Sequence, residues 1–307
     1  MSAAARKYAQ PPRWTDEQLE LRRREAIADF IASRSAEGSA RYRAAFASQL
    51  ANAEALFAAT HELLDFGSGA ALANAPGLIE IARYLGAPPI SGADLNTLAE
   101  VNVAKRKRLD SDLALKAEQV ILSALDPERF PWLSSDPPRS PTEDERQLAL
   151  RWTAGLKAAA ETQTGRRGEA STRQEAAVSE LLLSLGFEQV PPKPIGLTGG
   201  LREGQFSREA LVMGVKCDVP TRLKDGRLLL IEAKVSNEGT NSVKRLNREV
   251  GGKAREWNRQ LGAVAVPAAV IAGVFRLINL QRAQEDGIAI FWERDLNALA
   301  EFVRAAE

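Results

Sequence analysis

Two of the residue types that most often build catalytic and metal sites are almost absent from this sequence. It has one cysteine, Cys217, and one histidine, His61, in 307 residues. A single cysteine excludes a disulfide framework and cysteine-based zinc clusters. A single histidine argues against histidine-rich metal sites, histidine-dependent nucleases and a Ser-His-Asp triad, because a site histidine needs partners. His61 lies in a helical pattern, and we expect it to be structural.

Long apolar segments and phosphate-binding loops are also lacking. There is no run of about 18 or more apolar residues, so the sequence predicts no membrane span. The first residues include Arg6 and Lys7 but no apolar signal core, which predicts a cytoplasmic rather than a secreted protein. Ser91-Gly92-Ala93 lacks the glycine spacing and the Lys-Ser/Thr pair of a nucleotide-binding loop.

The remaining composition is ordinary, but its charges are unevenly spread. Hydrophobic residues make up 45% of the chain and charged residues 26%, as in many globular proteins, and the net charge is +1. Residues 234–259, however, carry seven basic and three acidic side chains. A basic strip of this kind beside carboxylates favours a protein that holds phosphates near a metal. A solvated helix face is the alternative explanation.

A proline- and acid-rich segment, residues 131–145, divides the sequence into two predicted domains. Residues 1–140 have helical patterns, and we expect an all-α N-terminal domain that dimerises or clasps DNA. Residues 141–307 alternate helices with strands, which predicts an α/β (α+β) domain with a mixed central sheet flanked by helices. Its first two helices are expected on either side of a flexible polar turn at residues 162–171.

The second domain is organised around one predicted hairpin, residues 215–235, with the sequence VKCDVPTRLKDGRLLLIEAKV. Asp225 and Gly226 supply turn chemistry between two apolar strands. The apolar residues 228–231 are typical of a strand buried on both faces, yet they continue directly into Glu232-Ala233-Lys234. Burying a glutamate and a lysine is unfavourable unless they have partners, so this conflict marks a candidate site.

The length of the hairpin loop decides which side chains meet. Residues i and i+2 of a strand share a face, so Glu232 and Lys234 point the same way. A two-residue loop would put Asp218 opposite Ala233, whereas a loop of three or five residues, or a bulge near Pro220, puts Asp218 opposite Glu232. We predict one of these two arrangements, the odd-numbered loop or the bulge. Adjacent carboxylates repel, and a hard cation such as Mg²⁺ relieves the repulsion.

The carboxylates and the lysine of this hairpin resemble the PD-(D/E)XK nuclease motif: Asp218, thirteen intervening residues, then Glu232-Ala233-Lys234. The elements expected around them are similar to the αβββαβ core of that superfamily. The text KVSNEGTNSVKRLNREVGGKAREW resembles type II restriction endonucleases of the XamI type. The resemblance covers about residues 163–307 and extends more weakly to the opening QPPRWTDEQL. One departure is Cys217, which stands where the family motif has proline.

The resemblance implies a restriction-endonuclease-like core and a role for each residue of the motif. Asp218 and Glu232 would hold Mg²⁺, with the carbonyl of Ala233 as a further ligand. Lys234 would orient the attacking water and stabilise the charge that develops on the phosphate. A buried Asp–Lys–Glu ion network without a metal is the alternative explanation of the same residues.

Glu175, on the first helix of the predicted core, is a further candidate. In similar enzymes this helix often carries a glutamate that reaches the metal or its water, and Glu175 matches that glutamate by position only. A surface carboxylate that pairs with Arg173 or Arg166 is the alternative.

The residues after the motif are rich in side chains that read base edges. Arginine can bridge guanine O6 and N7, and asparagine can bridge adenine N6 and N7. Lys253 and Arg255 are expected to contact phosphates instead. An exposed amphipathic helix is the alternative. The predicted DNA-binding residues are Ser236, Asn237, Asn241, Ser242, Lys244, Arg245, Asn247, Arg248, Lys253 and Arg255.

Together these patterns predict a type II restriction endonuclease. The resemblance implies hydrolysis of double-stranded DNA at a short palindrome, with Mg²⁺, leaving 5′-phosphates. A palindrome needs two symmetric active sites, so we expect a homodimer, with a DNA methyltransferase acting on the same sequence as its counterpart. A structure-selective or repair nuclease on the same core, or a non-catalytic DNA-binding module, is the alternative. The sequence leaves open the recognition sequence, the cut position and the number of metal ions.

Overall fold

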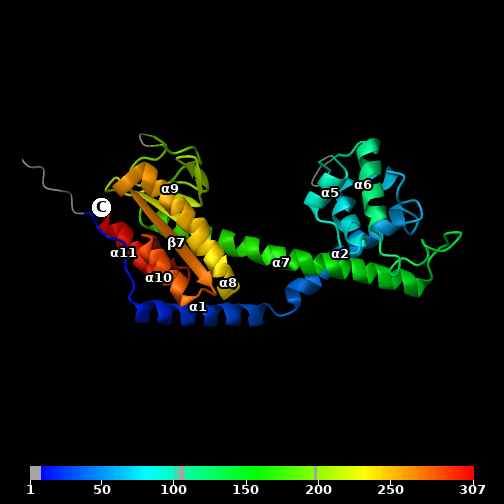
Figure 1. Ribbon diagram of the computed structural model, residues 1–307, viewed down its shortest axis with the longest axis horizontal. Helices are drawn as coiled ribbons and strands as arrows, with labels where there is room; N and C mark the ends of the chain where they lie inside the picture. The colour runs from blue at the N-terminus through cyan, green and yellow to red at the C-terminus, as the bar shows by residue number, and fades with distance from the viewer. Residues whose placement is uncertain (1–7, 101, 104–107, 197–198) are drawn as a thin grey trace, which may run out of the picture. The chain divides into compact units, whose positions relative to one another are not determined.

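The computed structural model describes residues 8–100, 102–103, 108–196 and 199–307, without the side chains of residues 166–168. This part of the chain forms two compact units (Figure 1). The sheet unit comprises the chain up to Ala36 together with Arg166–Glu307, and the helical unit comprises Glu37–Gly165. Each unit has an apolar core of its own.

The helical unit is built from short helices around a mostly aliphatic core with an aromatic centre. Phe57, Phe130 and Trp132 are fully buried, with ring centroids 5.6 to 6.4 Å apart. Edge-on contacts of this kind add to the free energy of burying the rings. Its described helices are α2 (Ala40–Ala59), α3 (Ala70–Asn74), η1 (Pro76–Leu78), α4 (Ile79–Ala82), η2 (Arg83–Leu85), α5 (Gly92–Leu98), α6 (Ser111–Ser123) and the first part of α7 (Glu143–Ser184).

The sheet unit contains a six-stranded mixed sheet in the order β1-β2-β5-β6-β7-β8. β5 pairs antiparallel with β2 and β6, whereas β1–β2, β6–β7 and β7–β8 are parallel. The predicted mixed central sheet is therefore confirmed. The strands are β1 (Glu188–Gln189), β2 (Gln205–Phe206), β5 (Val219–Arg222), β6 (Leu228–Ser236), β7 (Ala265–Gly273) and β8 (Ala289–Trp292), with β3 (Ala210–Val212) and β4 (Val215–Cys217) in a separate antiparallel pair.

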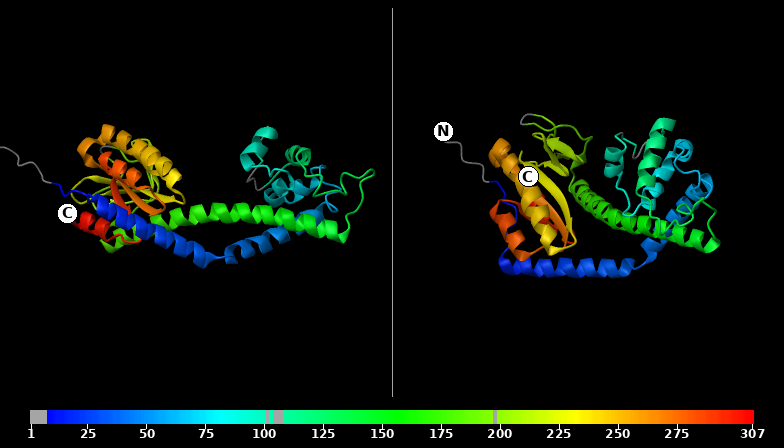
Figure 2. Two further views of the ribbon diagram at one scale, coloured as in Figure 1. Left: turned by 60° about the horizontal axis from the view of Figure 1, so that its bottom comes forward. Right: turned by 45° about the vertical axis from the view of Figure 1, so that its right-hand side comes forward.

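Helices cover both sides of this sheet (Figure 2). Leu229 and Ile231 of β6 share one core cluster with α7 and α11, whereas Leu228 and Leu230 pack against α9 on the other side. The predicted strand that is buried on both faces is therefore confirmed. The helices of this unit, besides the second part of α7, are α1 (Asp16–Glu37), α8 (Gly239–Ser242), the π-helix η3 (Val243–Val250), α9 (Gly251–Leu261), η4 (Gly262–Val264), α10 (Leu277–Glu285) and α11 (Asn297–Ala305).

β5 and β6 form the predicted hairpin from Val219 onward, with an odd-numbered loop, whereas residues 215–217 form β4 and pair with β3 instead. Val219 pairs with Ile231, and the ladder ends with five residues, 223–227, between the strands. Continuing the same pairing by one residue beyond Val219 brings Asp218 opposite Glu232. The register on which the shared site depends is therefore confirmed.

The turn of this hairpin follows from its sequence. The backbone N–H of Leu223 donates to the carbonyl of Arg227 at 2.9 Å, which narrows the loop to three residues. Gly226 has φ +90°, a left-handed conformation that glycine adopts without strain. Asp225 Oδ1 accepts a hydrogen bond from the Arg227 N–H at 3.0 Å, as an aspartate in a turn commonly does.

The flexible turn predicted at residues 162–171 is wrong, because α7 runs unbroken from Glu143 to Ser184. A glycine inside a helix costs only about 1 kcal/mol relative to alanine, so two glycines do not end a long helix. Neither α7 nor any other described helix is long and apolar enough to cross a membrane.

The observed division of the chain also differs from the predicted boundary at residue 140. α1 belongs to the sheet unit, because Leu19 and Ala26 are buried in one cluster with residues of η3, α9, α10 and β8. The indole N–H of Trp14, just before α1, donates to the carbonyl of Ile290 at 2.8 Å. The N-terminal helix therefore completes a core whose other residues come from the end of the chain, and a division by composition along the sequence missed it.

Candidate active site

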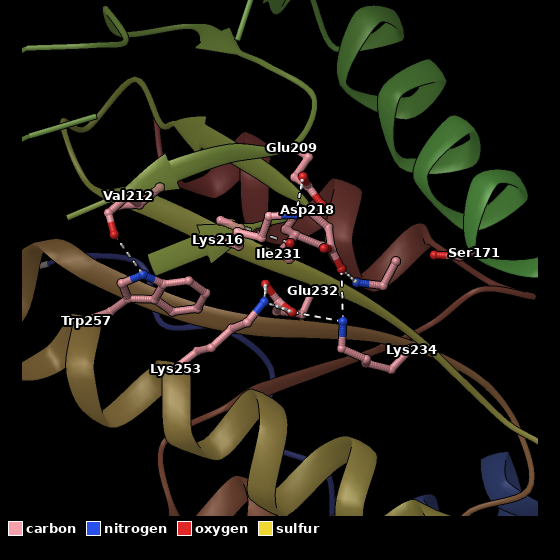
Figure 3. A network of polar contacts seen from close by, with 12 residues as sticks. Ser171, Glu209, Val212, Lys216, Asp218, Ile231, Glu232, Lys234, Lys253 and Trp257 are labelled. Carbon is pink, nitrogen blue, oxygen red and sulfur yellow. Dashed lines mark hydrogen bonds and ion pairs between the residues drawn. The ribbon is translucent and has the colours of Figure 1, made fainter. Parts of the chain in front are cut away.

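Four charged side chains meet beside the hairpin: Asp218, Glu232, Lys234 and Lys253 (Figure 3). Lys234 Nζ lies 2.8 Å from Glu232 Oε2 and 3.0 Å from Asp218 Oδ2, so it bridges the two carboxylates. Lys253 Nζ lies 2.8 and 2.7 Å from the two oxygens of Glu232. The structure thus brings the three predicted residues of the motif together and adds Lys253 to them.

The geometry of β6 explains why these groups meet. Strand alternation puts Glu232 and Lys234 on the face that α9 covers. Glu232 is fully buried, with 0% of its surface exposed. Asp218 lies in the break between β4 and β5, and its Oδ2 accepts a hydrogen bond from the backbone N–H of Ala233 at 2.8 Å. The hairpin backbone therefore fixes Asp218 beside Glu232.

Burial and mutual charge determine the protonation of the cluster. Burial raises the pKa of Glu232 because it disfavours the carboxylate; Lys234 and Lys253 oppose this effect, and Asp218 adds to it. Burial alone would lower the pKa of Lys234, but the charges of Glu232 and Asp218 outweigh it, and this pKa is raised. Lys234 is therefore charged at neutral pH. Burial also raises the pKa of the neighbouring Cys217 well above its usual range, so this residue is an unreactive thiol.

The donor set of the cluster fits a hard divalent cation. Asp218 and Glu232 offer carboxylate oxygens, and Mg²⁺ needs only one or two of these because it keeps several waters. Within the described part of the chain, Asp218 Oδ1 accepts no hydrogen bond, which leaves it available as a ligand. The described residues contain no group of three or more His, Cys, Asp or Glu side chains that could hold a metal. A cation here would therefore take its other ligands from the backbone, from water and from a substrate.

A pocket with a volume of about 280 Å³ adjoins β6 at Ala233 and Val235, whose side chains alternate with those of Glu232 and Lys234. Ala233, the residue between the two charged members of β6, forms part of its wall. Four residues that the sequence predicted to bind DNA line it as well, and their amide and basic side chains suit base edges and phosphates. The lining consists of Ser171, Ala233, Val235, Asn237, Asn241, Lys244, Arg245 and Glu249.

One wall of the pocket comes from the π-helix η3. Leu246 and Val250 of η3 are buried in the core, while Lys244, Arg245 and Glu249 line the pocket. π-Helical turns are rare and occur frequently at functional sites. The helix predicted over residues 242–261 is present as α8, η3 and α9, but the residue pattern gave no sign that part of it is π-helical.

Three of the predicted DNA-binding residues make hydrogen bonds within the fold. Ser236 and Ser242 are buried, and their hydroxyls donate to backbone carbonyls within three residues, at 2.8 and 2.5 Å. The amide of Asn247 donates to the carbonyl of Asn279 at 3.1 Å. Serine and asparagine make such local bonds as readily as they bind bases, so residue type alone did not separate the two roles.

Three further members of the predicted DNA-binding set lie outside the pocket lining. Lys253 was expected to contact a phosphate. In this structure its ammonium group is bound to Glu232, because α9 faces β6 at this point, and its contact with DNA stays a prediction. Arg248 and Arg255 are exposed, and their contact with DNA stays a prediction.

Glu175 lies near the pocket but outside the cluster. Its Oε1 accepts a hydrogen bond at 3.0 Å from the hydroxyl of Ser171, which lines the pocket. The alternative pairing with Arg173 is not formed, since Arg173 pairs with Glu293 at 2.6 Å. A role for Glu175 in metal binding stays a prediction.

Comparison with known proteins identifies the enzyme class of this chain and the family to which it belongs. A model of the XamI restriction endonuclease family matches residues 63–292, which include the hairpin, the cluster and the pocket wall. The type II restriction enzyme XamI from Xanthomonas campestris pv. amaranthicola is 40% identical over 196 residues, which are 62% of this chain and 70% of that protein. The predicted enzyme class, a site-specific endodeoxyribonuclease, is therefore confirmed. The chain belongs to the XamI restriction endonuclease family.

A search of solved structures gives a weaker match. Protein VC1899 from Vibrio cholerae aligns with a TM-score of 0.30 and 14% identity, over 83% of this chain. The chain spans 57% of that protein. At this level the similarity supports no argument about fold or function.

Proposed function

We propose that this type II restriction endonuclease requires Mg²⁺, cuts both strands of DNA at a short palindrome and leaves 5′-phosphates. The observation that carries the proposal is the cluster of Asp218, Lys234 and Glu232 beside a pocket of amide and basic side chains. We also propose that the sheet unit is a PD-(D/E)XK core, in which Asp218 and Glu232-Ala233-Lys234 form the motif. The hairpin register supports this assignment, because it aligns the two carboxylates.

In this proposal Asp218, Glu232 and the carbonyl of Ala233 hold the cation. A bound Mg²⁺ would supply Lewis-acid polarisation of the phosphate and a more acidic water. The two carboxylates keep the site selective for hard cations, because soft metals prefer the cysteine and histidine ligands that this chain almost lacks.

Lys234 would supply the fixed positive charge of the reaction. Two carboxylates hold its ammonium group, at 2.8 and 3.0 Å, so its position varies less than that of a surface lysine. Its raised pKa keeps it protonated at the pH of the cell. A charge placed in advance stabilises the negative charge that develops on the phosphate, and the remaining N–H can orient a water. Without Lys234, the paired carboxylates would repel the DNA backbone.

The pocket would hold the DNA that is being read. Asn237 and Asn241 offer amide groups for adenine edges, Arg245 can bridge guanine O6 and N7, and Glu249 can accept from cytosine N4. Lys244 is exposed and suits a phosphate. Recognition next to the cluster would place the scissile phosphate at Lys234.

Cleavage at a palindrome needs a second active site on the other strand, and we propose that a second copy of the chain supplies it. The helical unit is our candidate for the dimer contact or for a clasp on the DNA. A methyltransferase that acts on the same sequence would protect the host DNA. The proposed substrate implies that the enzyme acts in the cytoplasm.

The experiment that tests the proposal is cleavage of a long unmethylated phage DNA. Wild type, Lys234→Met and the control Lys224→Met are incubated with Mg²⁺ and, separately, with EDTA. Lys224 is a matched control because it is a lysine of the same hairpin that pairs with Glu307, away from the cluster. We expect discrete bands from wild type and Lys224→Met with Mg²⁺, and none from Lys234→Met or in EDTA.

The other outcomes separate the alternatives. A smear from wild type would indicate a non-specific or repair nuclease. Retention of DNA in a gel shift without cleavage would indicate a binding module. Cleavage by Lys234→Met at the rate of wild type would contradict the proposed site. Sequencing the ends of discrete fragments gives the recognition sequence, the stagger and the position of the phosphate.

A further inference from the structure

Glu232 has two lysine partners, whereas the reaction proposed above uses only one of them. We propose that Lys253 is the built-in counter-ion of Glu232, and that it sets the affinity of the site for its divalent cation by competing with that cation. This inference rests on the proposed function, because it takes Glu232 to be a cation ligand. It gives a role to Lys253, which lies 21 residues after Glu232 and outside the motif.

The geometry shows how fully Lys253 occupies the carboxylate. Its Nζ lies within hydrogen-bond distance of both oxygens, 2.8 Å from Oε1 and 2.7 Å from Oε2. Lys234 reaches only Oε2 and shares its ammonium group with Asp218. A carboxylate has about four lone-pair sites; hydrogen bonds from Lys253 fill two of them, and the charge of Lys234 lies 2.8 Å from Oε2. An incoming cation would therefore displace Lys253 or bind close beside its charge.

The charges of the cluster give the sign of the effect. With Lys253, two carboxylates face two ammonium groups, and the net charge is zero. Without it, the net charge is −1. Displacement and repulsion both oppose the cation, so removal of Lys253 tightens cation binding by either route.

The packing of α9 holds Lys253 in place while leaving its ammonium group able to move. Trp257, one turn further along α9, is fully buried, and its indole N–H donates to the carbonyl of Val212 at 3.3 Å. Ala254 is buried as well. The side chain of Lys253, by contrast, is 25% exposed, compared with 11% for Lys234. Its flexible stem can turn toward solvent when the carboxylate takes another cation.

The test measures Mn²⁺ binding to the full chain without DNA, with free Mn²⁺ followed by electron paramagnetic resonance. Lys253→Met should bind Mn²⁺ on the order of tenfold more tightly than wild type. One nearby charge shifts the pKa of a carboxylate by about one unit or more, which is at least a tenfold change in its proton-binding constant, and we expect a change of similar size for Mn²⁺. Lys253→Arg keeps the charge, and its guanidinium group can bind both oxygens of the carboxylate, so this variant should bind Mn²⁺ no more tightly than wild type. The control Lys224→Met should stay within about twofold of wild type. Lys253→Gln is a second neutral variant in case Lys253→Met folds poorly.

Glu232→Gln separates the counter-ion role from a general effect on the fold. The tighter binding should disappear when Lys253→Met is combined with Glu232→Gln, because the competition takes place on that carboxylate. Unchanged or weaker binding by both folded neutral variants, with wild type binding Mn²⁺, would overturn this inference alone. Absence of Mn²⁺ binding by wild type and every variant would overturn both the inference and the proposed cation site.

Discussion

The two units each contain a fully buried glutamate, and the two glutamates are held in opposite ways. Glu118 in the helical unit and Glu232 in the sheet unit are both 0% exposed. The carboxylate of Glu118 accepts three backbone N–H bonds at the start of α3, from Gly67, Gly69 and Leu72 at 2.7, 2.8 and 3.0 Å. Among the described residues, the carboxylate of Glu232 is bound only by the ammonium groups of two lysines.

This difference separates a structural buried charge from one that can take part in chemistry. Backbone donors belong to the fold and cannot leave without unfolding it, so Glu118 is committed to holding the turn before α3. Lysine side chains are long and flexible, and they can give up a carboxylate to another cation. The partners of a buried carboxylate, rather than its burial, therefore mark it as a candidate ligand.

A third buried carboxylate shows that the distinction does not depend on the unit. Asp225 lies in the hairpin that carries Glu232, and it is 9% exposed. It accepts from the backbone N–H of Arg227 at 3.0 Å and from its Nε at 2.8 Å, which closes the turn. Asp225 therefore belongs with Glu118 as a structural carboxylate, although it is close to the site in sequence.

The largest expected effect is on cleavage by Glu232→Gln. If Glu232 is a cation ligand, as proposed, the variant should cut DNA on the order of 10³-fold more slowly, as when one charge-stabilising group leaves an active site. Its unfolding free energy should fall by only about 1 kcal/mol, because Lys234 remains paired with Asp218 and the ammonium group of Lys253 can reach solvent. Single-turnover cleavage and urea unfolding measure the two quantities. A variant that cuts like wild type would remove Glu232 from the site.

Glu118→Gln should show the opposite pattern. The amide N–H₂ of the glutamine would face backbone N–H groups from which the carboxylate of wild type accepts hydrogen bonds. We therefore expect a loss of about 3 kcal/mol in the unfolding free energy. Below the melting temperature, cleavage per folded molecule should stay within about threefold of wild type. Urea unfolding followed by circular dichroism checks the first value. An unchanged urea midpoint would show that the three backbone bonds contribute little.

Asp225→Asn should lower stability less, by about 2 kcal/mol. The loss arises because the buried guanidinium group of Arg227 loses its counter-charge, and it is limited because asparagine can still accept a hydrogen bond from the Arg227 N–H. Arg227 also lies over the ring of Phe302, with its guanidinium carbon 5.5 Å from the centroid, which limits the loss. Cleavage at low temperature should not change. A large loss of cleavage with an unchanged melting temperature would place Asp225 with Glu232 instead.

The smallest expected effect is in the pH dependence of stability. Because burial raises the pKa of Glu232, the folded protein binds this proton more tightly than the unfolded chain does. The resulting stabilisation is full below about pH 4.3, the usual value for a free glutamate, and is lost as the pH rises through the raised pKa. The unfolding free energy of wild type relative to Glu232→Gln should therefore decline over this range in urea titrations. A difference independent of pH would argue against the raised pKa.

The sequence predicted those parts of the site that depend on local rules. The period of two along a strand put Glu232 and Lys234 on one face, and the odd loop aligned Asp218 with Glu232. The apolar residues before Glu232 indicated burial on both faces. These features are set within one hairpin, so the residue pattern contains them.

Features that depend on packing between distant elements were missed. Lys253 meets Glu232 because of the way α9 lies on the sheet, and a charge count along the chain could only suggest a phosphate contact. Ser236 and Ser242 looked like base readers because of their residue type, but the turns after β6 use their hydroxyls. Leu19 of α1 packs in the core of the sheet unit. The domain boundary predicted from sequence composition placed this helix in the other domain.

The most direct test of the proposed site compares the two buried glutamates in one experiment. Glu232→Gln and Glu118→Gln are measured side by side for single-turnover cleavage with saturating Mg²⁺ and for urea unfolding at the same temperature. We predict that Glu232→Gln loses cleavage and keeps its stability, whereas Glu118→Gln loses stability and keeps its cleavage. If both variants lost cleavage only in proportion to stability, Glu232 would be a structural carboxylate, and the proposed site would be contradicted.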